Sequence, residues 1–142
     1  ILLHRSFPLV VSCVSPDVHG HYVVVEGSLE GRPINLVSVY VPPAMGASTL
    51  ADLTAVLAAL PQGLTLVDGV FNDVMSADLD RLGPPGLRTC PAGDLSWWAE
   101  GLGLCDVWRL WNPLARGYTH TSAAHDSHSR SDLILLPAPD VT

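Results

Sequence analysis

Polar side chains stand at the ends of three apolar segments, and their types suit chemistry on a phosphodiester. Tyr40 ends INLVSVY, Asn72 follows LTLVDGVF, and Asp132 opens DLILLP shortly after Ser129 and Arg130. Phosphodiester cleavage requires carboxylates for a hard cation, an acid that orients water, and neutral donors for the phosphate oxygens. Asp132, Asn72 and Tyr40 have the side chains for the last two of these roles.

Each of these residues also has an ordinary structural explanation. A tyrosine at a strand end is typical of a core ring with a solvated hydroxyl, and Asn72 alone is typical of a turn. Asp132 alone is typical of a solvated acid or a turn cap. Only their order along the chain favours a common site.

Val70 lies among the polar residues at the end of LTLVDGVFND, and its apolar side chain cannot ligate a metal or a phosphate. Side chains two residues apart on a strand share a face, so Val70 and Asn72 are predicted to face the same side. Asp68 shares that face, but it lies about 7 Å back along the strand.

Two other groups of residues could carry chemistry. His120, His125 and His128 could ligate zinc, but a tip rich in serine and histidine is more typical of a solvated hairpin. The tryptophans are predicted to extend the core, because nucleic-acid stacking platforms usually interleave basic residues. They are Trp97, Trp98, Trp108 and Trp111.

The composition indicates one folded, acidic domain. Of the 142 residues, 48% are hydrophobic and 15% charged, which argues against disorder. The net charge is −7 and all seven basic residues are arginine, which disfavours non-specific nucleic-acid binding but not a cation-dependent enzyme. No apolar segment approaches the roughly 20 residues that span a bilayer.

The cysteines and the N-terminal residues indicate in which compartment the protein resides and whether the chain is part of a longer protein. Cys13, Cys90 and Cys105 fit neither a zinc pattern nor a disulfide framework, which predicts a reducing compartment. ILLHRSFPLVV lacks the basic region and cleavage site of a signal peptide. It also lacks an initiator methionine, so we expect the chain to be a piece of a longer protein.

The apolar patterns predict an α/β arrangement. Most elements are strands, and the helices are expected over 48–60, with Ser48 as N-cap, and over 94–104. Segment 77–94 is predicted to be a long loop with at most one helical turn, and 105–113 to be irregular. The expected strands are 7–14, a hairpin over 21–41, 64–68, 117–122 and 132–137, the last two separated by a polar hairpin.

The motifs taken together resemble the endonuclease/exonuclease/phosphatase family, most closely the endonuclease domain of LINE-type (non-LTR) retrotransposons. INLVSVYVPP, LTLVDGVFNDVMSADLDR, GLCDVWRLWNP and GYTHTSAAHDSHSRSDLILL occur here in the order of that family's motifs. The resemblance extends over residues 1–137. It implies a partial four-layer α/β/β/α sandwich (DNase-I-like), present as a single incomplete domain without the first and last family strands.

The same resemblance implies Mg²⁺-dependent hydrolysis of DNA. Tyr40 matches the phosphate-contacting tyrosine, and Asn72 the asparagine that binds and polarises the scissile phosphate. Asp132 matches the acid that pairs with a catalytic histidine, with Ser129 and Arg130 as its lead-in and as substrate contacts. The implied partners are DNA and a reverse transcriptase in a longer polyprotein, and the implied compartments are the cytoplasm and then the nucleus.

Departures from the family pattern predict that the chain is catalytically inactive and binds Mg²⁺ only weakly. Val70 occupies the position of the family's aspartate, and the family's metal-binding glutamate and final Asp-His fall outside the points equivalent to Ile1 and Thr142. Glu26 and Glu30 lie in the wrong hairpin to replace that glutamate, and neither Asp140 nor His128 matches the missing pair.

Two other functions are compatible with the sequence, and the missing strands have a structural consequence. The chain could be a non-catalytic module that binds nucleic acid or protein through the cleft that corresponds to the family's active site. Alternatively, it could hydrolyse small phosphate esters. Absent central strands would leave long apolar edges unpaired, so we expect the isolated chain to aggregate.

Overall fold

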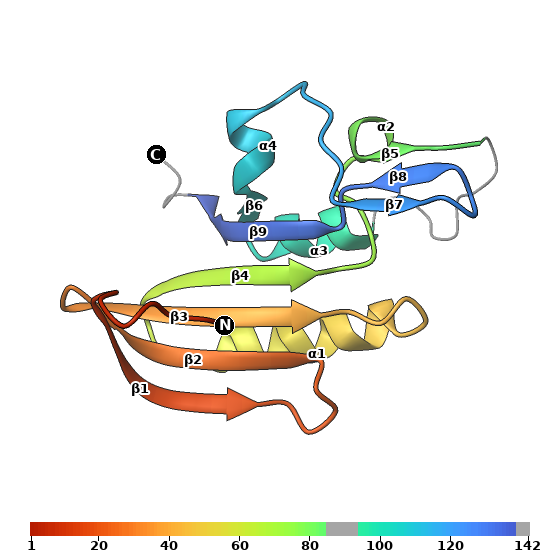
Figure 1. Ribbon diagram of the computed structural model, residues 1–142. Coiled ribbons are helices and arrows are strands. Elements are labelled where there is room, and N and C mark those ends of the chain that lie inside the picture. Colours follow the sequence, from red (N-terminus) through yellow and green to blue (C-terminus); the bar gives the residue numbers. More distant parts are fainter. Residues whose placement is uncertain (85–93, 139–142) are drawn as a thin grey trace.

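A six-stranded sheet forms the body of the molecule in the computed structural model, which describes residues 1–84 and 94–138 (Figure 1). Its strand order is β1-β2-β3-β4-β9-β6, and only the β3–β4 pair is parallel. The strands are β1 Leu9–Pro16, β2 Tyr22–Leu29, β3 Arg32–Tyr40, β4 Leu64–Val70, β6 Leu104–Asp106 and β9 Asp132–Pro137.

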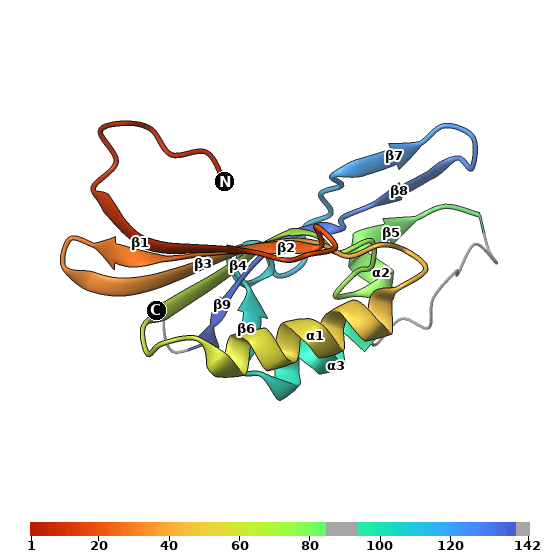
Figure 2. The ribbon, with the colours of Figure 1, turned by 90° about the horizontal axis from the view of Figure 1, so that it is seen from below.

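A smaller sheet stands beyond the end of the large sheet at which β3 and β4 finish and β9 begins (Figure 1). Its strand order is β5-β8-β7, and the β7–β8 hairpin projects from the side of the large sheet opposite α1 and α3 (Figure 2). The strands are β5 Arg81–Leu82, β7 His120–Ser122 and β8 Ser127–Ser129.

Two helices cover one face of the large sheet, α1 (Gly46–Ala59) and α3 (Asp94–Gly101) (Figure 2). We call the opposite face the open face; residues 1–8 pass on that side. Two short helices complete the chain, α2 (Ala77–Asp80) and α4 (Val107–Trp111). Within the described ranges, no helix has the length and apolar composition to cross a bilayer.

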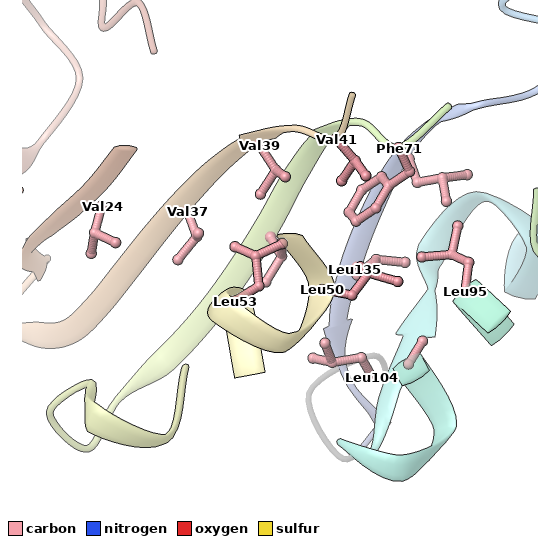
Figure 3. Packing of buried hydrophobic residues seen from close by; sticks show 13 residues of the cluster. Val24, Val37, Val39, Val41, Leu50, Leu53, Phe71, Leu95, Leu104 and Leu135 are labelled. Atoms are coloured by element: carbon pink, nitrogen blue, oxygen red, sulfur yellow. The ribbon is translucent and has the colours of Figure 1, made fainter. Parts of the chain in front are cut away.

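The core lies between the sheet and these two helices, and alternation along the strands creates it (Figure 3). Val37, Val39 and Val41 point toward α1 (Figure 3). By alternation, the intervening residues of β3 face the open side. Phe71, Leu95 and the other apolar side chains fill the space between sheet and helices. The most completely buried apolar side chains are Val37, Leu53, Val67, Phe71, Val74, Leu95, Ala99 and Leu135.

The fold class agrees with the expectation, while several element boundaries do not. Strand β4 runs to Val70 rather than ending at 68, and α1 begins at Gly46 because Met45, not Ser48, is its N-cap residue. The Ser48 hydroxyl instead donates to the Met45 carbonyl at 3.1 Å. Helix α2 is the single helical turn that the sequence allowed in 77–94, whereas β5 and α4 were not expected, since they carry too few residues to show a period. Residues 85–93 of that segment lie outside the described ranges.

The polar hairpin also differs from its expected place. Strand β7 is shorter than 117–122 and pairs with β8, not with 132–137. Segment 132–137 is a strand as expected, but it belongs to the large sheet between β4 and β6.

The uncovered apolar surface is one edge and one face of the sheet. The inner strands β2, β3, β4 and β9 each have a partner on both sides. The eight-residue β1 forms an edge, where Val10, Val11 and Val14 are 67%, 44% and 56% exposed. The other edge, β6, has only three residues and is largely buried, so in the described part of the chain β1 is the one long apolar edge of this sheet.

We predict that a charge on β1 reduces aggregation. Val14→Lys should lower the aggregated fraction several-fold, measured by light scattering, because lysine at an exposed edge opposes pairing with another strand. Val18→Lys adds the same charge in the β1–β2 turn, where Val18 is 94% exposed, and should have little effect. Equal effects of both variants would show that net charge rather than the edge controls aggregation.

Candidate functional site

Three of the candidate positions form a row across the large sheet. Tyr40 pairs with Val70 in the parallel β3–β4 ladder, and Val70 pairs with Asp132 in the antiparallel β4–β9 ladder. Because the neighbours Val39, Phe71 and Leu133 are buried toward the helices, all three side chains of the row point toward the open face. We call Tyr40, Val70 and Asp132 the strand-end row.

The row depends on a close approach of β3 and β4 at Gly69. This residue has φ +146°, and a Cβ there would lie 1.9 Å from the Val39 carbonyl oxygen. Only glycine allows the strands to meet at this position, which keeps Val70 beside Tyr40. Tyr40 is 49% exposed and Asp132 is also exposed, so both can reach a ligand.

Asn72 lies just past the row and does not continue the alternation of β4. The strand ends at Val70, and Asn72 has the left-handed φ of +52°. Its Nδ2 donates to the Val41 carbonyl at 2.8 Å, joining the chain ends that follow β3 and β4. The argument that Val70 and Asn72 share a strand face therefore does not hold, because it requires an extended backbone through residue 72.

Asn72 also borders a pocket of about 210 Å³ on the helix side of the sheet. Pro42 and Pro43, the first residues of α1, and Phe71 and Leu95 line it. Asp73 at its rim pairs with Arg81 at 2.9 Å. Asn72 thus stands between this pocket and the open face, whereas Val70 does not line the pocket.

Arg130 lies away from the strand-end row, inside a buried network. It is only 3% exposed, and its Nε and one terminal nitrogen donate to the two Asp80 oxygens at 2.9 and 3.1 Å. The guanidinium also bonds Asp106, and it stacks 4.8 Å from the centre of the Trp108 ring. Arg109 pairs with Asp80 and stacks on the same ring.

The network satisfies charges that burial would otherwise disfavour. Burial opposes ionisation of Asp80, but the hydrogen bonds and charge of Arg130, with the bond from Arg109, hold its pKa below the usual value. Burial likewise favours the neutral form of Arg130, yet Asp80 and Asp106 raise its pKa. Arg130 is therefore buried and bonded to protein carboxylates through Nε and one terminal nitrogen, which leaves it unavailable to a substrate.

Ser129 also lies outside the row, because it belongs to the small sheet. It is half-buried in β8, opposite Arg81 and His120. The Arg130 network was not predicted from the sequence, although Asp106, Trp108 and Arg109 all lie in the motif GLCDVWRLWNP. Nothing in the spacing identified Asp80 as its partner, since the two residues are 50 positions apart.

Loss of Arg130 should destabilise the protein strongly. Arg130→Ala leaves two buried carboxylates without their main partner, and we expect the free energy of unfolding to fall by about 3–5 kcal/mol. Urea unfolding measures this change. Arg116 is exposed, so Arg116→Ala is the matched control, and its free energy of unfolding should stay within about 0.5 kcal/mol of the parent's. A loss below about 1 kcal/mol for Arg130→Ala would contradict a supporting role of the network.

Asp68 faces the open side one pair of residues before the row, between Ser38 and Ile134. Burial raises the pKa of its carboxyl group, and no arginine pairs with it in the described part of the chain. The folded protein therefore binds this proton more tightly than the unfolded chain. The stabilising effect of protonation is complete below the unfolded pKa and is lost as pH rises through the folded pKa.

Asp68→Asn should therefore stabilise the protein relative to the parent at neutral pH. The gain should be small near about pH 3 and grow toward about pH 7, because only the parent must bury a charge there. Thermal unfolding at several pH values measures this difference. The exposed Asp52→Asn is the control, and an equal pH trend in both variants would contradict the assignment to Asp68.

The histidine group does not form a zinc site. Among the described residues, no group of three or more histidine, cysteine, aspartate or glutamate side chains could hold a metal ion. His128 instead bonds the Thr121 hydroxyl at 2.9 Å and stacks on Tyr118 with ring centres 5.4 Å apart. Cys13 is exposed and Cys105 half-buried, while Cys90 lies outside the described residues.

The tryptophans divide into two pairs. Trp98 packs against the core and donates to the Leu50 carbonyl and the Thr54 hydroxyl, and Trp108 carries the two stacked arginines. Trp97 and Trp111 are 76% and 74% exposed, so they do not extend the core as predicted.

The donors along the row do not fit a magnesium ion, which requires several oxygen ligands in octahedral geometry. The row offers one carboxylate, Asp132, with an apolar side chain next to it. Of the three glutamates, Glu26 lies opposite Asn35 on the helix side, Glu30 lies in the β2–β3 turn at the far end of the sheet, and Glu100 lies on α3. None of them faces the row.

Several solved structures share this fold, although no family model matches the sequence. An AP endonuclease from Archaeoglobus fulgidus aligns with TM-score 0.68 and 19% identity over 92% of this chain and 60% of its own. The endonuclease domain of TRAS1, a telomere-specific non-LTR retrotransposon, aligns with TM-score 0.60 and 20% identity. The alignment covers 95% of this chain and 57% of that domain. A humanized TDP2 from D. rerio aligns with TM-score 0.60 and 14% identity, over 94% of this chain and 54% of its own.

These likenesses establish the fold, and the resemblance predicted from the motifs is confirmed at that level. The chain spans between 54% and 60% of the length of these three structures. Identities of 20% or less do not by themselves transfer an activity.

Proposed function

We propose that this chain, which has the endonuclease/exonuclease/phosphatase fold, is a DNA-binding domain that contacts phosphate at the strand-end row without cleaving it. The observation that carries the proposal is the position of Val70 between Tyr40 and Asp132 in the paired strands. The exposed Tyr40 hydroxyl supplies a neutral group for a phosphate oxygen, whereas the Asn72 amide already donates to the Val41 carbonyl. The apolar centre cannot orient an attacking water.

The open side of the row supports binding to an extended ligand. The β7–β8 hairpin projects on that side beyond the start of β9, so a strand lying over Tyr40 and Asp132 would pass beside it (Figure 2). With a net charge of −7, counterion release contributes little, so binding depends on a few directed contacts.

The proposal includes a context for the domain. Likeness to a retrotransposon endonuclease supports a place in a longer polyprotein with a reverse transcriptase, with DNA as partner in the nucleus after synthesis in the cytoplasm. Sequencing the transcript on both sides of this segment tests that context. An in-frame reverse transcriptase downstream supports it, and interrupted or unrelated reading frames on both sides contradict it.

The chain should bind DNA and fail to nick it. We expect no nicking of supercoiled plasmid with Mg²⁺ by the parent or by Val70→Asp, because no glutamate faces the row. A labelled duplex should bind in an anisotropy assay, and Tyr40→Phe should weaken that binding by about three- to tenfold through loss of one hydroxyl. Tyr118→Phe removes a hydroxyl outside the row and is the matched control.

Two results would overturn the proposal. Nicking by the parent that Asp132→Ala abolishes would show that the row is catalytic. Absence of binding to the duplex at low salt would show that DNA is not the ligand.

A further inference from the structure

His21, the residue before β2, lies next to Tyr40 and extends the strand-end row by one position. Tyr22 pairs with Val39, and the Tyr40 amide donates to the His21 carbonyl at 2.7 Å. Tyr22 packs against the core on the helix side. Because neighbouring side chains of an extended segment alternate, His21 faces the open side beside the Tyr40 ring.

The β1–β2 turn holds His21 in this place through Asp17. One Asp17 carboxylate oxygen accepts the amides of His19 and His21 at 3.2 and 3.0 Å. The Asp17 amide donates to Tyr22 at 2.9 Å, which closes the turn. His21 therefore has a fixed backbone, and its side chain is only 17% exposed.

The same carboxylate also lies beside the His21 imidazole. Asp17 Oδ2 lies 3.9 Å from His21 Nδ1. The hydrogen bond from the His21 amide is the main reason that the pKa of Asp17 is lower than usual. The other titratable groups facing His21 are His19, with ring centres 5.8 Å apart, and Tyr40 on β3. An anionic Asp17 on one side of the ring leaves Nε2 to donate to a ligand on the other.

We propose that His21 is a phosphate-positioning residue, which as an imidazolium binds an oxygen of the nucleic-acid phosphate that Tyr40 contacts. This inference rests on the proposed function. Residues directly opposite in an antiparallel pair have Cβ atoms about 5 Å apart, so one phosphate can accept from both side chains. A metal-binding role for this turn does not fit, because no three-ligand group exists among the described side chains and the bonded Asp17 oxygen already accepts two amides.

Anisotropy of a labelled DNA duplex with single variants tests the assignment. His21→Asn should weaken binding about tenfold at about pH 6 and much less at about pH 8, since only the imidazolium provides a charged donor. His21→Arg keeps a cation and should bind at both pH values with little pH dependence. His4→Asn, in the exposed segment before β1, removes a histidine elsewhere and should bind as the parent does.

The outcomes separate this inference from the proposed function. If Tyr40→Phe weakens binding while His21→Asn does not, the site stands and the role of His21 is wrong. If neither variant binds less than the parent, both are wrong. Competition against the labelled duplex identifies the ligand. If inorganic phosphate displaces it only at far higher concentrations than unlabelled duplex does, the site binds a nucleic-acid phosphate. If the two competitors are equally potent, that assignment is wrong.

Discussion

One buried arginine connects segments that the chain keeps far apart. Arg130 lies between Asp80 at the end of α2 and Asp106 at the end of β6, with the Trp108 ring against its guanidinium. Each buried charge is tolerated only because the others are present. Since β9 begins two residues later, this network fixes where that strand enters the sheet and thus where Asp132 meets Val70.

The geometry of the strand-end row does not depend on a polar side chain at its centre. Valine favours extended backbone more than aspartate does, so its presence at position 70 is consistent with a strand that continues to the row. Gly69 supplies the close approach to β3, and the side chain of Asn72 joins the ends of both strands. Geometry and reactivity therefore depend on different residues, and a change at the centre of the row need not disturb the pairing.

Motif order was sufficient for the fold, and the strand-end residues followed from it. Tyr40, Asn72 and Asp132 were expected at strand ends from apolar runs and turn residues, and the ladders place Tyr40 and Asp132 on either side of Val70. The extent of β4, the capping of α1 and the pairing of β7 with β8 were not predictable, because a few residues near a turn carry too little periodic information.

The sequence by itself determined the type of fold and the apolar side chain at position 70, because apolar spacing and residue identity are local properties. Tertiary structure decided which polar side chains share an environment. It buried Arg130 against carboxylates up to 50 positions away and turned Asn72 out of the strand alternation. It also placed His21 beside Tyr40. These outcomes depend on strand register and on the cost of burying unpaired charge, and both are set by contacts between segments distant in sequence.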